Sequence, residues 1–174
     1  NINTELMYDN VMNKFRWGGI EDSTVYIDEN VQRMLSNFRY TFASLANALL
    51  DTGKLDSTRL VLDKCLQLMP NRIVPYNASI LPLIQVYYEL GDYDKANLLV
   101  TELSGVIDQE LAYFTDIQNF SPVKYSLIAS DYNFSIRTLY NLFSLARSYG
   151  QEELAGTLIM MVQNYDRSMS SLFQ

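Results

Sequence analysis

The chain has 174 residues, of which 48% are hydrophobic and 13% aromatic, and 13 Lys and Arg stand against 20 Asp and Glu for a net charge of −7. This composition is typical of a folded globular chain and excludes disorder for the chain as a whole. The absence of histidine and the single cysteine exclude Ser-His-Asp and Cys-His catalysis, an internal disulfide and a cysteine-rich zinc site. The acidic charge argues against nucleic acid and anionic membrane surfaces as partners, and no apolar run reaches the roughly 20 residues that span a bilayer. We expect no cofactor and no metal.

The first residues predict a short helix over 4–15 and a turn at Trp17-Gly18-Gly19. The apolar residues expected to face the rest of the fold are Leu6, Met7, Val11, Met12 and Phe15. We interpret Trp17 as an anchor for this helix, the alternative being an aromatic platform for a ligand. Because the chain begins with Asn rather than Met and shows no targeting peptide, we expect a fragment or a mature product.

Residues 31–50 carry apolar side chains at spacings of three and four, which predicts an amphipathic helix that ends before Gly53. Asp28 is placed to cap its start, and capping explains this carboxylate better than cation binding does. A second periodic stretch runs over 56–69 and stops at Pro70. Two such helices joined by a glycine turn form a helical hairpin.

The same order of residues recurs around Gly91 and Gly150. At matching offsets from the three turn glycines lie residues that we expect in the interior: Leu45, Leu83 and Leu142; Thr58, Ala96 and Ala155; Leu62, Val100 and Ile159; Cys65, Leu103 and Val162. In such a position Cys65 behaves as a small apolar residue rather than a nucleophile.

This order resembles the tetratricopeptide repeat, a helix–turn–helix unit of about 34 residues. The resemblance implies an all-α fold of tetratricopeptide-like helical hairpin repeats in an α-α superhelix, with about three degenerate repeats, insertions and an N-terminal helix. We expect one helical-repeat domain over 1–174: the N-terminal helix and turn (1–27), repeat one (28–70), repeat two with an extended second helix (71–118), an insertion forming a loop or short irregular helix (119–131) and repeat three (132–174). The alternative is an irregular helical bundle.

A second resemblance is carried by residues 7–19, by Tyr26-Ile27-Asp28-Glu29-Asn30, and by Arg39, Phe42, Leu45 and Ala46. Together they resemble the C-terminal soluble region of large bacterial multi-spanning membrane proteins similar to protein O-mannosyltransferases. That family is regarded as glycosyltransferases that use a lipid-linked sugar, with the catalytic part N-terminal to this region. The resemblance implies a position on the periplasmic side of the cytoplasmic membrane and an accessory, non-catalytic role.

Tetratricopeptide arrays line their concave face with the first helix of each pair, which gives a register for candidate binding residues. By that register they are Tyr40, Asn47, Asp51, Gln85, Tyr88, Glu89, Arg137, Tyr140 and Arg147. The first function predicted is a protein-interaction or scaffolding domain that binds a peptide or protein segment, possible partners including the parent's own membrane domain. The alternative is a structural cap on that membrane domain with no separate ligand. Solvent-facing tyrosines favour binding, whereas a groove filled by residues 105–131 favours the cap. An independent hydrolase is disfavoured because no base and nucleophile are visible.

Overall fold

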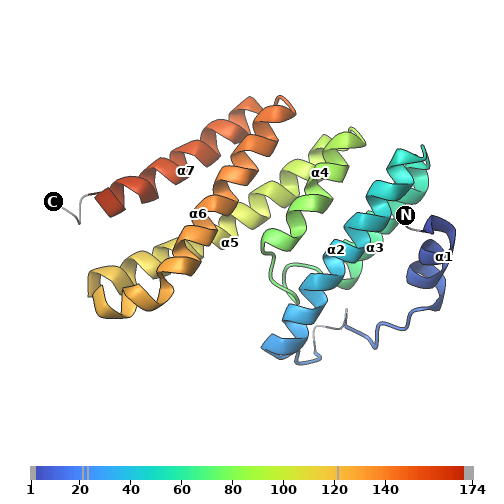
Figure 1. The fold of residues 1–174 in the computed structure, drawn as a ribbon, viewed down its shortest axis with the longest axis horizontal. Helices are drawn as coiled ribbons and strands as arrows, with labels where there is room; N and C mark the ends of the chain where they lie inside the picture. Colours follow the sequence, from blue (N-terminus) through green and yellow to red (C-terminus); the bar gives the residue numbers. More distant parts are fainter. Residues whose placement is uncertain (1–2, 21, 23, 121, 171–174) are drawn as a thin grey trace. The chain divides into compact units, whose positions relative to one another are not determined.

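The computed structural model describes residues 3–20, 22, 24–120 and 122–170, with side chains left out over 119–126 and 166–170. Regular structure in these residues is entirely helical (Figure 1). The elements are α1 (Thr4–Asp9), the π-helical turn η1 (Asn10–Lys14), α2 (Glu29–Asp51), α3 (Leu55–Leu68), the 3-10 turn η2 (Ala78–Ile80), α4 (Leu81–Glu89), α5 (Tyr93–Phe120), α6 (Pro122–Ser148) and α7 (Glu152–Ser170). The predicted all-α class is confirmed, and the superhelical stacking of repeats stays a prediction.

The chain divides into two compact units, Asn1–Leu99 and Val100–Gln174. In the first unit α2 contacts α1, α3 and α4. In the second unit α6 packs along α7, and Tyr165 of α7 donates a hydrogen bond to Asp108 Oδ1 of α5 at 2.7 Å. Each unit therefore has helices that cover one another's apolar sides.

The first helix of the first hairpin begins where the sequence predicts. The Asp28 carboxylate accepts hydrogen bonds from the backbone N–H groups of Asn30 and Val31, at 2.8 and 3.0 Å. These bonds satisfy donors that have no partner inside the helix. The capping interpretation of Asp28 is confirmed.

The three predicted turn glycines share one geometry. At Gly53, Gly91 and Gly150 φ is +74°, +77° and +71°, a region that glycine enters without the penalty that a Cβ imposes. In each turn the glycine N–H bonds to the carbonyl three residues earlier, and the next N–H bonds to the carbonyl five residues earlier. This is the Schellman motif, which satisfies the last carbonyls of a helix. All three helical hairpins are thus closed in the same way.

Equivalent positions of the three hairpins are buried, as their shared offsets predict. Ile159 is half-buried, and the other predicted interior residues are buried: Leu45, Leu83, Leu142, Thr58, Ala96, Ala155, Leu62, Val100, Cys65, Leu103 and Val162. Small side chains at Ala96 and Ala155 leave room for the neighbouring helix to approach closely.

The N-terminal helix differs from its prediction. Val11 is buried, but Leu6 and Phe15 are 55% and 49% exposed. The six-residue α1 is followed by a π-helical turn, whose wider winding breaks the 3.6-residue period that would have kept these apolar residues on one face. Trp17 packs against the rings of Phe38 and Phe42 of α2, both with centroids at 5.6 Å, which is the contact expected of an anchor.

The segment 119–131 was predicted as a loop or short irregular helix, and that prediction is wrong. Residues 119–120 end α5, and 122–131 are the first turns of α6, while residue 121 lies outside the described residues. Pro122 stands at the first position of a helix, where its fixed φ and missing N–H cost nothing. The predicted extension of the second helix of repeat two is confirmed, because α5 has 28 residues.

Candidate functional site

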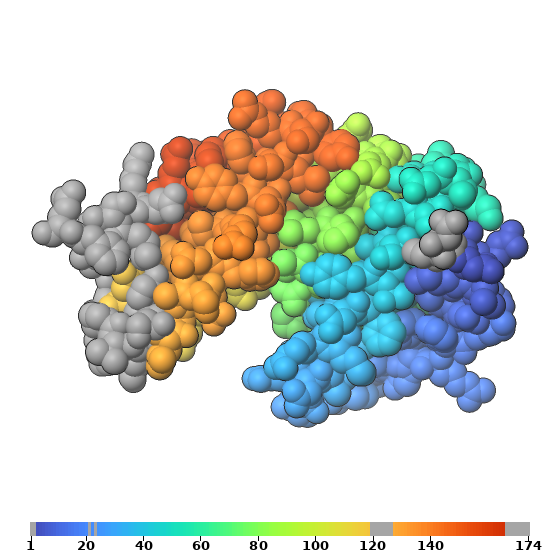
Figure 2. All heavy atoms as spheres, in the orientation of Figure 1, coloured from blue at the N-terminus to red at the C-terminus, as the bar shows by residue number. Residues whose placement is uncertain are grey.

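In the first unit, five of the candidate residues lie on two helices in contact. Tyr40, Asn47 and Asp51 are on α2, and Gln85 and Glu89 are on α4. Four of the five are exposed, Tyr40 by 46%, and Asn47 is half-buried. Both helices reach the surface in the view of Figure 2. We term these five residues the α2–α4 face.

The polar groups of the α2–α4 face are partly held by local hydrogen bonds. Gln85 Nε2 donates to Glu89 Oε1 at 2.8 Å, one turn along α4. Asn47 Nδ2 donates to the carbonyl of Ala43 at 3.1 Å, one turn back along α2. These bonds restrict the rotamers of both amides, while each amide retains a carbonyl oxygen that can accept from a ligand.

Tyr88 does not belong to this surface, and the prediction that its side chain faces solvent is wrong. Its side chain is 1% exposed, and its hydroxyl donates to Asn97 Oδ1 at 2.7 Å. Burial raises the pKa of Tyr88 to about 12. The register failed here because the short α4 buries residues around most of its circumference, including Leu83 and Val86.

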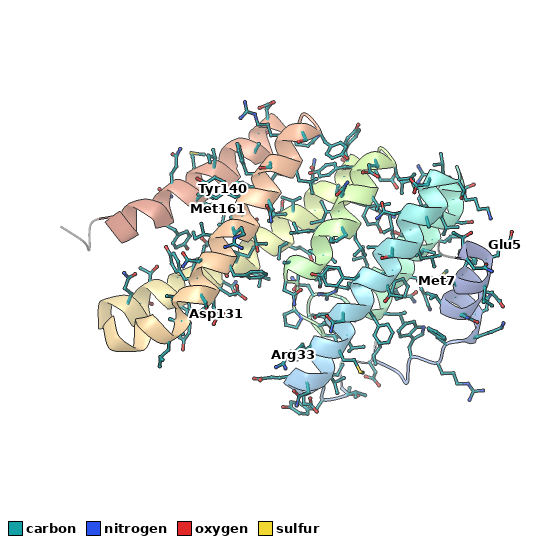
Figure 3. All side chains as sticks on the ribbon, viewed as in Figure 1. Glu5, Met7, Arg33, Asp131, Tyr140 and Met161 are labelled. Atoms are coloured by element: carbon teal, nitrogen blue, oxygen red, sulfur yellow. The ribbon has the colours of Figure 1, made fainter. Side chains whose placement is uncertain are left out.

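The remaining candidates form a separate, basic group on α6 in the second unit. Arg137, Tyr140 and Arg147 are all exposed, Tyr140 by 43%. Figure 3 labels Tyr140. The Arg147 guanidinium lies 5.9 Å from the centroid of the Phe143 ring, a cation–π contact. Apart from Tyr88, the predicted residues therefore give one acidic surface on the first unit and one basic surface on the second.

Cys65, the one thiol of the sequence, is buried as predicted. Its side chain is fully buried, and desolvation raises its pKa to about 12 against a smaller opposing effect of nearby Arg39. A thiol held neutral in an apolar interior is a poor nucleophile. Within the described residues no group of three or more His, Cys, Asp and Glu side chains is arranged to hold a metal ion.

Sequence reasoning missed two features of the first unit. The first is Arg39, which is fully buried in the middle of α2. Its signal was present, because it stands in register with Leu35, Phe42 and Ala46 within an apolar stripe. The second is an open hollow of about 390 Å³ beside α1, almost wholly apolar and lined by Asn3, Leu6, Met7, Asn10, Val11, Phe15 and Thr41 (Figure 3 labels Met7).

Comparisons with protein-family models, with curated proteins and with solved structures gave no match for this chain. Of the helices described, none combines the length and the apolar character needed to cross a membrane. The features that indicate a function are therefore the surface of each unit and the resemblances in the sequence.

Proposed function

We propose that this chain is a non-catalytic protein-interaction or scaffolding domain that binds an extended peptide or protein segment through the α2–α4 face. The observation that carries the proposal is the chemistry of that face. The first helices of two hairpins, α2 and α4, expose a tyrosine, the Gln85 amide and two carboxylates, and the half-buried Asn47 amide lies among them. Tyrosine offers rigid amphipathic contact area at a small entropic cost, and amides satisfy the backbone of an extended chain.

The charges of the face indicate the kind of segment that it would bind. Asp51 and Glu89 stand at the same position relative to the turn glycines Gly53 and Gly91. Both carboxylates therefore lie near the C-terminal ends of α2 and α4. A segment with a Lys or Arg at one end would be oriented by these carboxylates. We expect an affinity of about 1 μM, because the face offers few buried anchors.

We further propose that the domain is appended to a membrane glycosyltransferase-like protein and lies on the periplasmic side of the cytoplasmic membrane. The support is the resemblance carried by residues 7–19 and 26–30 to the C-terminal region of proteins similar to protein O-mannosyltransferases. In this proposal the sugar transfer belongs to the parent, and the domain positions a partner.

A structural cap on the parent's membrane domain is the second candidate function. One observation favours it, the apolar hollow beside α1 with the exposed side chains of Leu6 and Phe15 on its wall. A cap would bury this surface against the parent rather than bind a separate ligand through the α2–α4 face.

Selection from a displayed library of random 12-residue peptides tests the proposal, with affinities of the selected peptides measured by fluorescence anisotropy. We expect Tyr40→Ala with Gln85→Ala to weaken binding at least tenfold. The matched control is Tyr26→Ala with Gln67→Ala, which removes the same two residue types at exposed positions outside the face. Equal affinity of both double variants would contradict peptide binding through the α2–α4 face. Arg137→Ala with Tyr140→Ala tests the α6 surface in the same assay.

A further inference from the structure

Arg39 is a buried cation whose partners are all neutral. Its Nη2 donates to the carbonyls of Met69, at 3.2 Å, and of Val74. Its Nη1 donates to the carbonyl of Pro75 at 3.1 Å and to Ser79 Oγ at 3.4 Å. Among the residues that the structure describes, no carboxylate pairs with it.

Several features offset the cost of burying this charge. The Met69 carbonyl lies at the C-terminal end of α3, where the helix dipole is negative and favours a cation. The guanidinium also lies 4.9 Å from the centroid of the Tyr76 ring. One cost is not offset, because its Nε is buried and has no hydrogen-bond partner in the described structure. The planar fork of an arginine reaches several acceptors at once, which a lysine ammonium does not.

The acceptors of Arg39 all belong to the connection between α3 and α4, residues 69–79, which we term the strap. The strap is also held from within, because the Asn71 side chain accepts from the backbone N–H of Tyr76 at 2.9 Å. The N–H groups of Ile73 and Val74 bond to the Pro70 carbonyl at 2.9 and 3.0 Å. The strap ends within η2, which leads directly into α4, and Arg39 is the sequence neighbour of Tyr40 in α2.

We propose that Arg39 is a positioning residue that pins the strap to α2 and so holds α4 beside α2, assembling the α2–α4 face from its two helices. The physical basis is reach: one side chain of α2 donates to the Met69 carbonyl at the start of the strap, to the Pro75 carbonyl in its middle and to Ser79 Oγ at its end. Its importance for ligand binding rests on the proposed function, whereas the pinning of the strap does not.

Hydrogen exchange of the intact chain, followed by NMR or mass spectrometry, tests the pinning without any ligand. We expect Arg39→Met to speed exchange of the hydrogen-bonded amides of Ile73, Val74 and Tyr76 at least tenfold more than it speeds exchange in α3. Arg39→Lys keeps the charge but not the fork, so we expect an intermediate increase. Asn71→Ala loosens the strap without touching Arg39 and gives a smaller increase at the same amides.

The matched control is Arg59→Met, because Arg59 also binds a backbone carbonyl, that of Leu90, but is half-buried and lies outside the strap. This control leaves exchange in the strap unchanged if the proposal holds. A uniform increase of hydrogen exchange across α2, α3 and the strap would identify Arg39 as an ordinary core residue. That result would contradict the proposal. If Arg39→Met does not fold, Arg39→Lys decides alone: exchange at the wild-type rate in the strap contradicts the pinning. Local loosening with unchanged peptide affinity would retain the pinning and reject its role in the proposed function.

Discussion

Arg39 and Arg59 of the first unit show how burial changes the energetic role of an arginine. The side chain of Arg59 is 36% exposed and pairs with Asp92 at 3.0 Å and Asp56 at 3.6 Å. Exposed pairs of this kind contribute about 0–1 kcal/mol. Arg39 is fully buried, so removing its guanidinium takes the donor from the buried carbonyls of Met69 and Val74, at about 1–3 kcal/mol for each unsatisfied group.

The first prediction concerns Leu45, which is fully buried in α2. Leu45→Ala leaves a cavity that the surrounding helices fill only in part, so we expect the free energy of unfolding to fall by about 2–5 kcal/mol. The matched control is Leu60→Ala, because Leu60 on α3 is 53% exposed and we expect a change within about 0.5 kcal/mol. Urea unfolding followed by circular dichroism measures both. Similar losses for the two variants would contradict the assignment of Leu45 to the interior.

Individual residues were predictable from the sequence where a pattern repeats and not where packing decides. Leu45 and Ala96 were placed correctly because the same offsets recur around three turn glycines. Tyr88 was misplaced because offsets report the direction of a side chain and not what covers it. Arg39 broke an apolar stripe, and only the structure shows that the strap supplies its acceptors.

At the scale of elements, the hairpin turns are the features that the sequence specifies most directly. A helix followed by glycine at positive φ needs no tertiary contact to end, because the two Schellman bonds form within the turn. The start of α6 lacks such a signal, since Pro122 suits both a loop and the first turn of a helix. The conformation of the strap could not be predicted from the sequence either, because it depends on hydrogen bonds donated by Arg39 of α2.

The second prediction compares a glycine in the turn of a helical hairpin, Gly91, with a glycine inside a helix, Gly105. Gly91→Ala places a Cβ at a φ of +77° with no neighbouring atom within 4 Å, so the expected cost of about 1–2 kcal/mol comes from the backbone alone. Gly105 lies inside α5 with equal open space and without a positive φ, so Gly105→Ala is expected to stabilise by about 0.5–1 kcal/mol. Thermal unfolding of the two variants measures the difference. Changes of the same sign would contradict the positive φ assigned to Gly91.

At the scale of the whole molecule, the described residues form two helical units that share one chemical character, with tyrosines among their buried groups. Tyr87 and Tyr88 are buried in the first unit and Tyr132 in the second. The Tyr87 hydroxyl donates to Asp63 Oδ1 at 2.7 Å, and the Tyr132 hydroxyl donates to the Tyr165 carbonyl at 3.2 Å. Because each hydroxyl is a donor in these bonds, the folded state requires the neutral phenol. Burial, followed by the bond to Asp63, raises the pKa of Tyr87.

The last prediction follows from these neutral groups and concerns alkaline pH. Cys65 has its pKa raised from 9.0 to about 12 by burial, and Tyr88 from 10.0 to about 12. At a pH between the ordinary pKa of such a group and its raised pKa, the unfolded chain releases a proton that the folded chain keeps. The free energy of unfolding therefore falls as pH rises. This stability is fully present below pH 9 and is lost progressively above it. Between pH 9 and 10 the Cys65 thiol of the unfolded chain titrates ahead of its tyrosines, and it lowers the free energy of unfolding by at most about 1.4 kcal/mol per pH unit.

Urea unfolding at pH 7, 8, 9 and 10 measures this dependence, with Cys65→Ala as the matched variant. We expect wild type to be steady from pH 7 to 8 and to lose stability from pH 9 to 10. The Cys65→Ala variant starts lower because of its cavity, yet its loss over that last interval is smaller, since it lacks the thiol that titrates only in the unfolded chain. Parallel curves for the two proteins would mean that the thiol is accessible to solvent in the folded state. That result would contradict the burial of Cys65 in the first hairpin and the register that places it there.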